Sequence, residues 1–214
     1  MTIVDQAMDG HSSSLARSGA EVWDAAVQAA LRLLAAKPLH EVGLDHVAAY
    51  VGVPVGVIRE QIPDLNELLI AAIQHWYADR MAQVQANASR DGTVAFLRDL
   101  LRISLADPTC TRMVFTAASV AGTPDHAAVA PLRQMWVRFH AVVQRALAED
   151  IAAGREPDTM EPANGAEQLL SVYEGLQFQW LFRPHMDLLA AYDRATTRLR
   201  RGWSESYQAP VWDI

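Results

Sequence analysis

The chain of 214 residues has one cysteine, no long apolar run and no basic N-terminus. A single thiol, Cys110, excludes an internal disulfide framework, and we interpret it as a small buried residue in a reducing compartment. No apolar segment approaches the roughly 20 residues that a membrane-spanning helix needs. The first 15 residues contain no Lys or Arg, unlike a signal peptide. These absences predict a cytoplasmic protein with no membrane partner.

Motifs for catalysis and for metal binding are missing as well. The seven histidines are scattered and form no H-E-x-x-H pair, so no metal site is expected. The sequence contains neither a phosphate-cradling glycine loop nor a nucleophile elbow. We therefore predict a protein that is not an enzyme, has no catalytic residues and needs no cofactor.

Positive charge is scarce at the N-terminal end of the chain. The net charge is −7, and residues 1–70 contribute −5 of it, with four basic and nine acidic residues. Nucleic-acid phosphates are bound mainly through Lys and Arg. This charge distribution therefore does not favour non-specific binding to nucleic acid.

Helical periodicity is what the sequence does contain. Apolar residues recur every three to four positions, and no alternating strand pattern is longer than a few residues. Ser18-x-x-Glu21 is a capping box that predicts the start of a first helix, and Lys37-Pro38 predicts its end. Further helices are expected as a pair within 44–62, from 64 to about 87–92, and at about 93–106, 109–121, 126–153, 163–182 and 186–202. The chain is predicted to be all-α, with about nine helices.

Residues 44–62 have the pattern of a helix-turn-helix. A short apolar-faced helix ends at Gly52-Val53-Pro54, and a second one carries Ile58 and Ile62. Two helices joined by a tight glycine turn are the usual means of placing a helix in the major groove of DNA. The pattern predicts a flexible tail at 1–17, a three-helix head at 18–62 and a helical bundle at 63–214.

Four segments carry a family resemblance: Ala29-Ala30-Leu31-Arg32-Leu33-Leu34, Leu44-Asp45-His46-Val47-Ala48, Val51-Gly52-Val53 and Ile62-Pro63-Asp64-Leu65-Asn66-Glu67-Leu68-Leu69. Together with the order of the helices, they resemble the tetracycline-repressor (TetR/AcrR) family of transcriptional regulators. The resemblance implies a DNA-binding head, a body that binds a small apolar or amphipathic ligand, and a homodimer formed through the last two helices. Such proteins usually repress transcription from a palindromic operator in double-stranded DNA until the ligand changes the spacing of the two heads.

The sequence departs from the family pattern where DNA is contacted. Pro54 stands where a small polar residue usually begins the reading helix, and Val55 where a basic residue often follows. Asp45 and Leu65 also occupy positions that are often basic, and Arg59 replaces a phosphate-contacting Tyr. Two interpretations stay open. The chain is a DNA-binding regulator, most simply a ligand-responsive repressor, or it is a dimer of the same fold that has lost DNA binding and binds a small molecule or a protein.

The candidate DNA contacts are His46, Val55, Gly56 and Arg59. Val55 and Gly56 are expected to face outward, where they can contact thymine methyl groups. Arg59 is the strongest candidate for a phosphate or base contact, and its alternative is an ordinary exposed arginine. His46 either contacts phosphate or is simply solvated.

Candidate pocket residues are aromatic and polar side chains at helical spacing in the body: Trp76, Phe96, Met113, Trp136, Phe139, His140, Tyr173 and Gln177. The alternative for each is a place in the core, where aromatic stripes are commoner. Trp136 and His140 lie one turn apart on one helix face. Trp76 and Arg80 share that spacing and are expected to form a cation–π pair with a structural role.

The candidate dimer interface lies on the last two helices. Its predicted residues are Leu169, Val172, Leu176, Trp180, Leu188 and Tyr192, with Trp180 as the expected anchor. The alternative is that the same side chains form the core of a single subunit.

Overall fold

The computed structural model describes residues 18–37, 41–62, 64–108, 111–112, 114–115 and 129–205. Within these ranges the chain forms eight helices and no strand, so the prediction of an all-α fold is confirmed. The predicted tail at 1–17 and most of the helix predicted at 109–121 lie outside the described residues. The helices are α1 (Gly19–Ala36), α2 (Leu44–Val51), α3 (Val55–Gln61), α4 (Leu65–Asp91), α5 (Thr93–Ala106), α7 (Val129–Ala152), α8 (Pro162–Phe182) and α9 (Leu188–Trp203).

The first helix begins at the predicted capping box. The Glu21 N–H donates to Ser18 Oγ at 3.3 Å, and the Ser18 N–H donates to Glu21 Oε2 at 2.7 Å. These two bonds satisfy backbone donors that a helix start otherwise leaves without partners. At the other end, the Lys37 N–H closes the helix on the Leu33 carbonyl.

The turn between α2 and α3 depends on glycine. Gly52 ends α2 in the left-handed region, with φ of 78°, which other residues adopt only with strain. Pro54 then precedes α3 in an extended conformation, and its side chain caps nothing. Ile58 and Ile62 are fully buried with Val47 in the head core, so α3 is fixed against α1 and α2.

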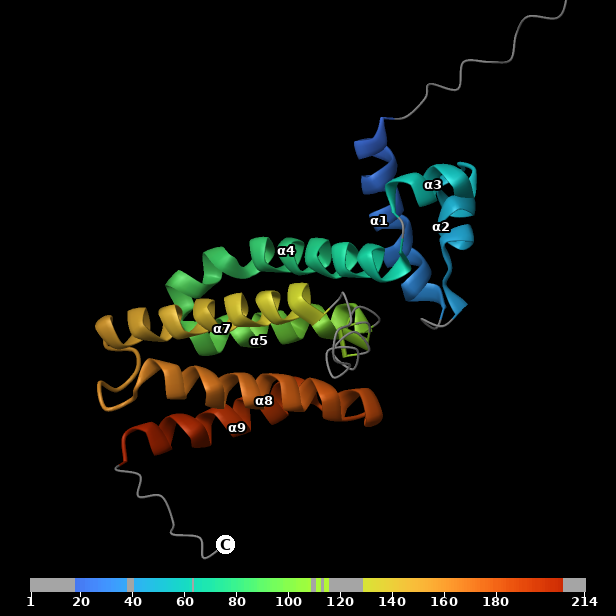
Figure 1. Ribbon diagram of the computed structural model, residues 1–214. Helices are drawn as coiled ribbons and strands as arrows, with labels where there is room; N and C mark the ends of the chain where they lie inside the picture. The colour runs from blue at the N-terminus through green and yellow to red at the C-terminus, as the bar shows by residue number, and fades with distance from the viewer. Residues whose placement is uncertain are drawn as a thin grey trace, which may run out of the picture.

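One long helix joins the head to the body. Figure 1 shows α4 running from the three-helix head across the bundle, where α7 lies over α5 and the pair α8 and α9 forms the opposite layer. A separate apolar cluster lies at the junction: Leu34 of α1, Ile73 of α4, and Leu132 and Met135 of α7 are all buried together. Head and body therefore share a packed contact.

At the far end of the bundle, Gly92 allows two elements to approach closely. Its φ is 86°, and a Cβ there would lie 3.3 Å from the carboxylate oxygens of Asp150. The buried Asp150 accepts the Thr93 N–H at 2.7 Å and pairs with Arg155 at 2.7 Å. The start of α5 is thus fixed to the end of α7. In the part of the chain that the structure describes, no helix has the length and apolar composition to cross a bilayer.

Candidate ligand cavity and DNA-binding surface

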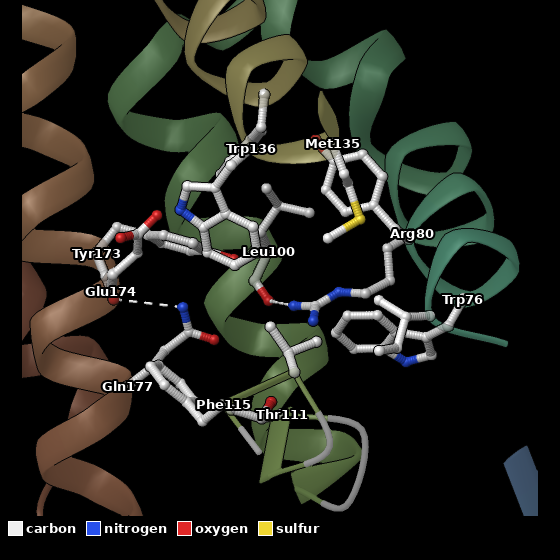
Figure 2. Close-up of a pocket in the computed structure, with 14 residues that line it drawn as sticks. Trp76, Arg80, Leu100, Thr111, Phe115, Met135, Trp136, Tyr173, Glu174 and Gln177 are labelled. Atoms are coloured by element: carbon white, nitrogen blue, oxygen red, sulfur yellow. Dashed lines mark hydrogen bonds between the residues drawn. The ribbon is translucent and has the colours of Figure 1, made fainter. Parts of the chain in front are cut away.

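A cavity lies between α4, α5, α7 and α8 (Figure 2). Its empty volume is about 600 Å³, including space open to solvent. Most of its surface is apolar and aromatic. The described residues that line it are Ile73, Trp76, Tyr77, Arg80, Leu100, Thr111, Val114, Phe115, Met135, Trp136, Phe139, Tyr173, Glu174 and Gln177.

Arg80 brings a buried cation to the cavity wall. Its side chain extends from α4 toward the middle of the cavity, and the residue is only 5% exposed. A terminal guanidinium nitrogen donates to the Leu100 carbonyl and, at 2.5 Å, to Ser104 Oγ. The guanidinium carbon lies 4.2 Å from the centre of the Trp76 ring, so the predicted cation–π pair is confirmed. The charge is permanent, because arginine does not deprotonate in proteins.

A chain of polar contacts continues from Arg80 to α8. Ser104 Oγ donates to Gln177 Oε1 at 2.9 Å, and Gln177 Nε2 donates to the Tyr173 carbonyl at 3.3 Å. All three residues are buried. These bonds hold the terminal guanidinium nitrogen of Arg80 in one orientation between α4 and α5.

The aromatic part of the wall is a set of edge-to-face contacts. The Tyr77 and Phe139 rings are 5.6 Å apart, and the Phe139 and Tyr173 rings 5.9 Å apart. Burial raises the pKa of both tyrosines, more than the nearby Arg80 charge lowers it. Both phenols are therefore neutral, and the wall that they form carries no charge of its own.

Glu174 is the carboxylic acid among the described lining residues. Burial raises the pKa of Glu174 above its ordinary value, and a hydrogen bond from Trp136 lowers it in part. Figure 2 shows Glu174 beside Trp136, on the side of the cavity away from Trp76. Raising the pKa of a carboxyl favours its neutral form, so the negative charge at this side is held less strongly than in water.

The structure brings five of the predicted pocket residues to this cavity: Trp76, Trp136, Phe139, Tyr173 and Gln177. Phe96 does not line it, because its side chain is buried in the core of the bundle. His140 is half-buried on α7 and does not line it either. Met113 lies outside the described residues. Sequence reasoning missed Glu174 as a lining residue and gave Arg80 a structural role only.

Only two of the four predicted DNA-contacting residues are exposed on the head. Arg59 and Gly56 are exposed on α3, and a Cβ added at Gly56 would meet no atom within 4 Å. Val55 is half-buried against the head core, so it faces outward only in part. His46 is partly engaged at the start of α2, where its Nδ1 accepts the Gly43 N–H at 3.2 Å. Tyr50, which sequence reasoning missed, is 56% exposed on α2.

A polar contact also links the head to α4. The side-chain amide of Gln28 on α1 is hydrogen-bonded to the ring of His75, with 2.6 Å between their nitrogen atoms. His75 also lies 3.5 Å from Asp79, one turn further along α4. The next residue along the chain, Trp76, lines the cavity. One short stretch of α4 therefore contacts both the head and the cavity.

Four of the six predicted interface residues belong to the core of their own subunit. Leu169, Leu188, Tyr192 and Trp180 are buried within the bundle, so the interface prediction is wrong for them. Val172 and Leu176 are half-buried against the same core. The apolar side chains that α8 does expose are Phe178, 51% exposed, and Phe182, 73% exposed, with ring centres 5.1 Å apart.

No protein-family model and no curated protein matches the sequence. Solved structures do match the fold. A TetR transcription regulator from Haloarcula marismortui aligns with a TM-score of 0.72 at 15% identity, over 83% of this chain and 96% of that one. The transcriptional regulator FadR from Bacillus subtilis, solved in complex with stearoyl-CoA, aligns with a TM-score of 0.66 at 14% identity, over 85% of this chain and 97% of that one.

A TetR-family member from Streptomyces coelicolor is 23% identical and aligns with a TM-score of 0.61, over 83% of this chain and 97% of that one. Each of these similarities covers more than four-fifths of this chain. They agree with the motifs at 44–62 and with the order of the helices in the sequence. The chain has the fold of the TetR-family transcriptional regulators, a helix-turn-helix head followed by a helical bundle.

Proposed function

We propose that this chain is a homodimeric, DNA-binding transcriptional regulator, most simply a repressor whose affinity for a palindromic operator is controlled by a small apolar or amphipathic ligand. The observation that carries the proposal is the double role of α4. This helix places Trp76 and Arg80 at the cavity and is held to α1 through the Gln28–His75 bond and the buried Ile73. A ligand that favours one position of α4 thereby favours one position of the head.

The head supports DNA binding through a small set of groups. Arg59 and Gly56 share the exposed surface of α3, the helix that enters the major groove in this type of motif. Tyr50 adds an exposed phenol on α2, a group that can donate to a phosphate oxygen. Because the head exposes few cations, its affinity for DNA should depend strongly on each of them. We propose that the protein carries out this role in the cytoplasm.

The dimer is supported by the aromatic pair on α8. Phe178 and Phe182 expose apolar surface that a second copy of α8 can cover, and aromatic residues are enriched at the centres of interfaces. The Phe178 ring also lies 5.7 Å from Phe115, a lining residue of the cavity. Cavity and proposed interface are therefore neighbours in the fold.

The test is a selection of genomic DNA fragments by the purified full-length protein at low and moderate salt. We expect recovery of a palindromic element by the wild type and its loss in Arg59→Ala. The matched control is Arg145→Ala, which removes an exposed arginine of α7 and the same charge. The Arg145→Ala variant should bind DNA as the wild type does, because Arg145 lies in the bundle and not on the head.

Two results contradict the proposal. The first is the absence of an enriched element at any salt concentration, which favours the alternative of a dimer that has lost DNA binding. The second is an enriched element that Arg59→Ala and Arg145→Ala weaken equally. That result indicates a general charge effect instead of a contact from α3.

A further inference from the structure

One charge at the cavity is both buried and permanent, and it is the positive charge of Arg80. Among the described residues that line it, Arg80 is the one cation and Glu174 the one carboxylic acid. Arg80 is almost fully buried, whereas Glu174 is half-buried beside Trp136, itself partly exposed. The cation thus belongs to the interior of the cavity, and the acid to its more exposed part.

The buried guanidinium acts strongly on whatever occupies the cavity. The wall is mostly apolar, and electrostatic interactions are stronger where water is excluded. Two partners of Arg80, the Leu100 carbonyl and the Ser104 hydroxyl, are neutral groups that orient the guanidinium. A carboxylate that enters here gains a charge-assisted hydrogen bond, whereas a ligand cation is repelled.

A second polar group faces the same space. Thr111 lines the cavity, and its hydroxyl is buried without a hydrogen-bond partner within the described part of the chain. Buried polar atoms normally have partners, so one without a partner at a cavity wall suits a ligand group. The Thr111 hydroxyl is a further donor available to an acid group.

The opposing carboxyl of Glu174 lies at the more exposed part of the cavity, beside Trp136. Burial raises the pKa of Glu174, which favours its neutral form and weakens its repulsion of an anionic ligand. The neutral phenols of Tyr77 and Tyr173 add no negative charge. Among the described residues that line the cavity, the permanent charge is therefore the positive charge of Arg80.

The shape of the cavity restricts the apolar part of the ligand. Flat rings of Trp76, Phe139 and Tyr173 form much of the wall, and aromatic rings pack well against such faces. The empty volume of about 600 Å³, which includes space open to solvent, lies in the usual range of small-molecule sites, about 300–1,000 Å³. A single planar ring can lie against these aromatic faces.

We propose that the cavity binds a small aromatic carboxylate, with its carboxylate at the Arg80 guanidinium and its ring against the aromatic wall. This inference rests on the proposed ligand-responsive function and names the class of ligand. It does not depend on the head, and it is tested without DNA.

The test is isothermal titration of the full-length protein with three probes of similar shape: phenylacetate, 2-phenylacetamide and phenethylamine. We expect phenylacetate to bind about tenfold or more tightly than 2-phenylacetamide, the difference expected for a hydrogen bond to a charged group. Phenethylamine should bind most weakly. Arg80→Met should reduce the affinity for phenylacetate to that for 2-phenylacetamide, whose own affinity should change little, and Arg145→Met should change neither.

Arg80 also ties α4 to α5, so the thermal unfolding of each variant is measured alongside. If Arg80→Met does not fold, Arg80→Lys retains the charge and should keep the preference for the carboxylate. Equal binding of acid and amide, tighter binding of the amine, or no binding of any probe to the folded wild type overturns the proposal. None of those results affects the selection of a DNA element, which tests the proposed function. The titration can therefore fail while the proposed function stands.

Discussion

Replacing Phe182 by Ala should separate the proposed dimer without unfolding the subunit. Phe182 is 73% exposed in the single chain. Complete burial of a Phe side chain contributes roughly 3 kcal/mol at most, so covering the exposed part contributes about 2 kcal/mol in each subunit. A twofold interface contains the residue twice, so the substitution should cost about 4 kcal/mol, or roughly a thousandfold in the dimer dissociation constant.

Sedimentation equilibrium over a range of protein concentrations measures this constant. Tyr50→Ala is the matched control, because it removes an aromatic ring that is 56% exposed on the head. It should leave the dimer unchanged. Thermal unfolding of the Phe182→Ala subunit should change little, since surface substitutions usually alter stability by about 0.5 kcal/mol or less. A Phe182→Ala protein that dimerises as tightly as the wild type, or a monomeric wild type, refutes the assignment of this interface.

Two further predictions concern α8. Leu169→Ala should lower the free energy of unfolding by about 2–5 kcal/mol in urea titrations, because this side chain is fully buried in the subunit core; a loss of dimer with little loss of stability would instead place Leu169 at the interface. Glu174→Gln should be more stable than the wild type at neutral pH, with an advantage that shrinks toward about pH 4. The reason is that the raised pKa of Glu174 makes the folded wild type bind a proton more tightly than the unfolded chain, so its stability falls as the pH rises above the ordinary value of 4.5. Thermal unfolding across this range measures the difference, and a constant offset at all pH values contradicts it.

Local patterns of the sequence predicted the features that depend on neighbouring residues. The Ser18–Glu21 capping box, the left-handed Gly52 and the Trp76–Arg80 pair all form within one or two turns. Each follows from helix geometry and from the chemistry of the side chains involved. For that reason the helix-turn-helix and most helix boundaries could be predicted.

Burial on a particular face depends on how distant helices assemble, and the sequence does not show it. Leu169 and Tyr192 have the same apolar pattern whether they meet their own bundle or a second subunit, and the structure places both in the bundle core. Val55 is half-buried because the short helix α3 packs closely on α1 and α2. Likewise, Arg80 faces a cavity only because α4, α5, α7 and α8 come together around it.

In the proposed regulator, one helix, α4, links the occupancy of the cavity to the position of the head. The most direct test is the affinity of the wild-type dimer for the selected DNA element, measured by fluorescence anisotropy with and without phenylacetate at a concentration that saturates the cavity. Coupling between sites commonly amounts to about 1–3 kcal/mol, so we predict a loss of affinity of roughly 5- to 150-fold. An unchanged affinity for DNA while the cavity is fully occupied would contradict this link between cavity and head.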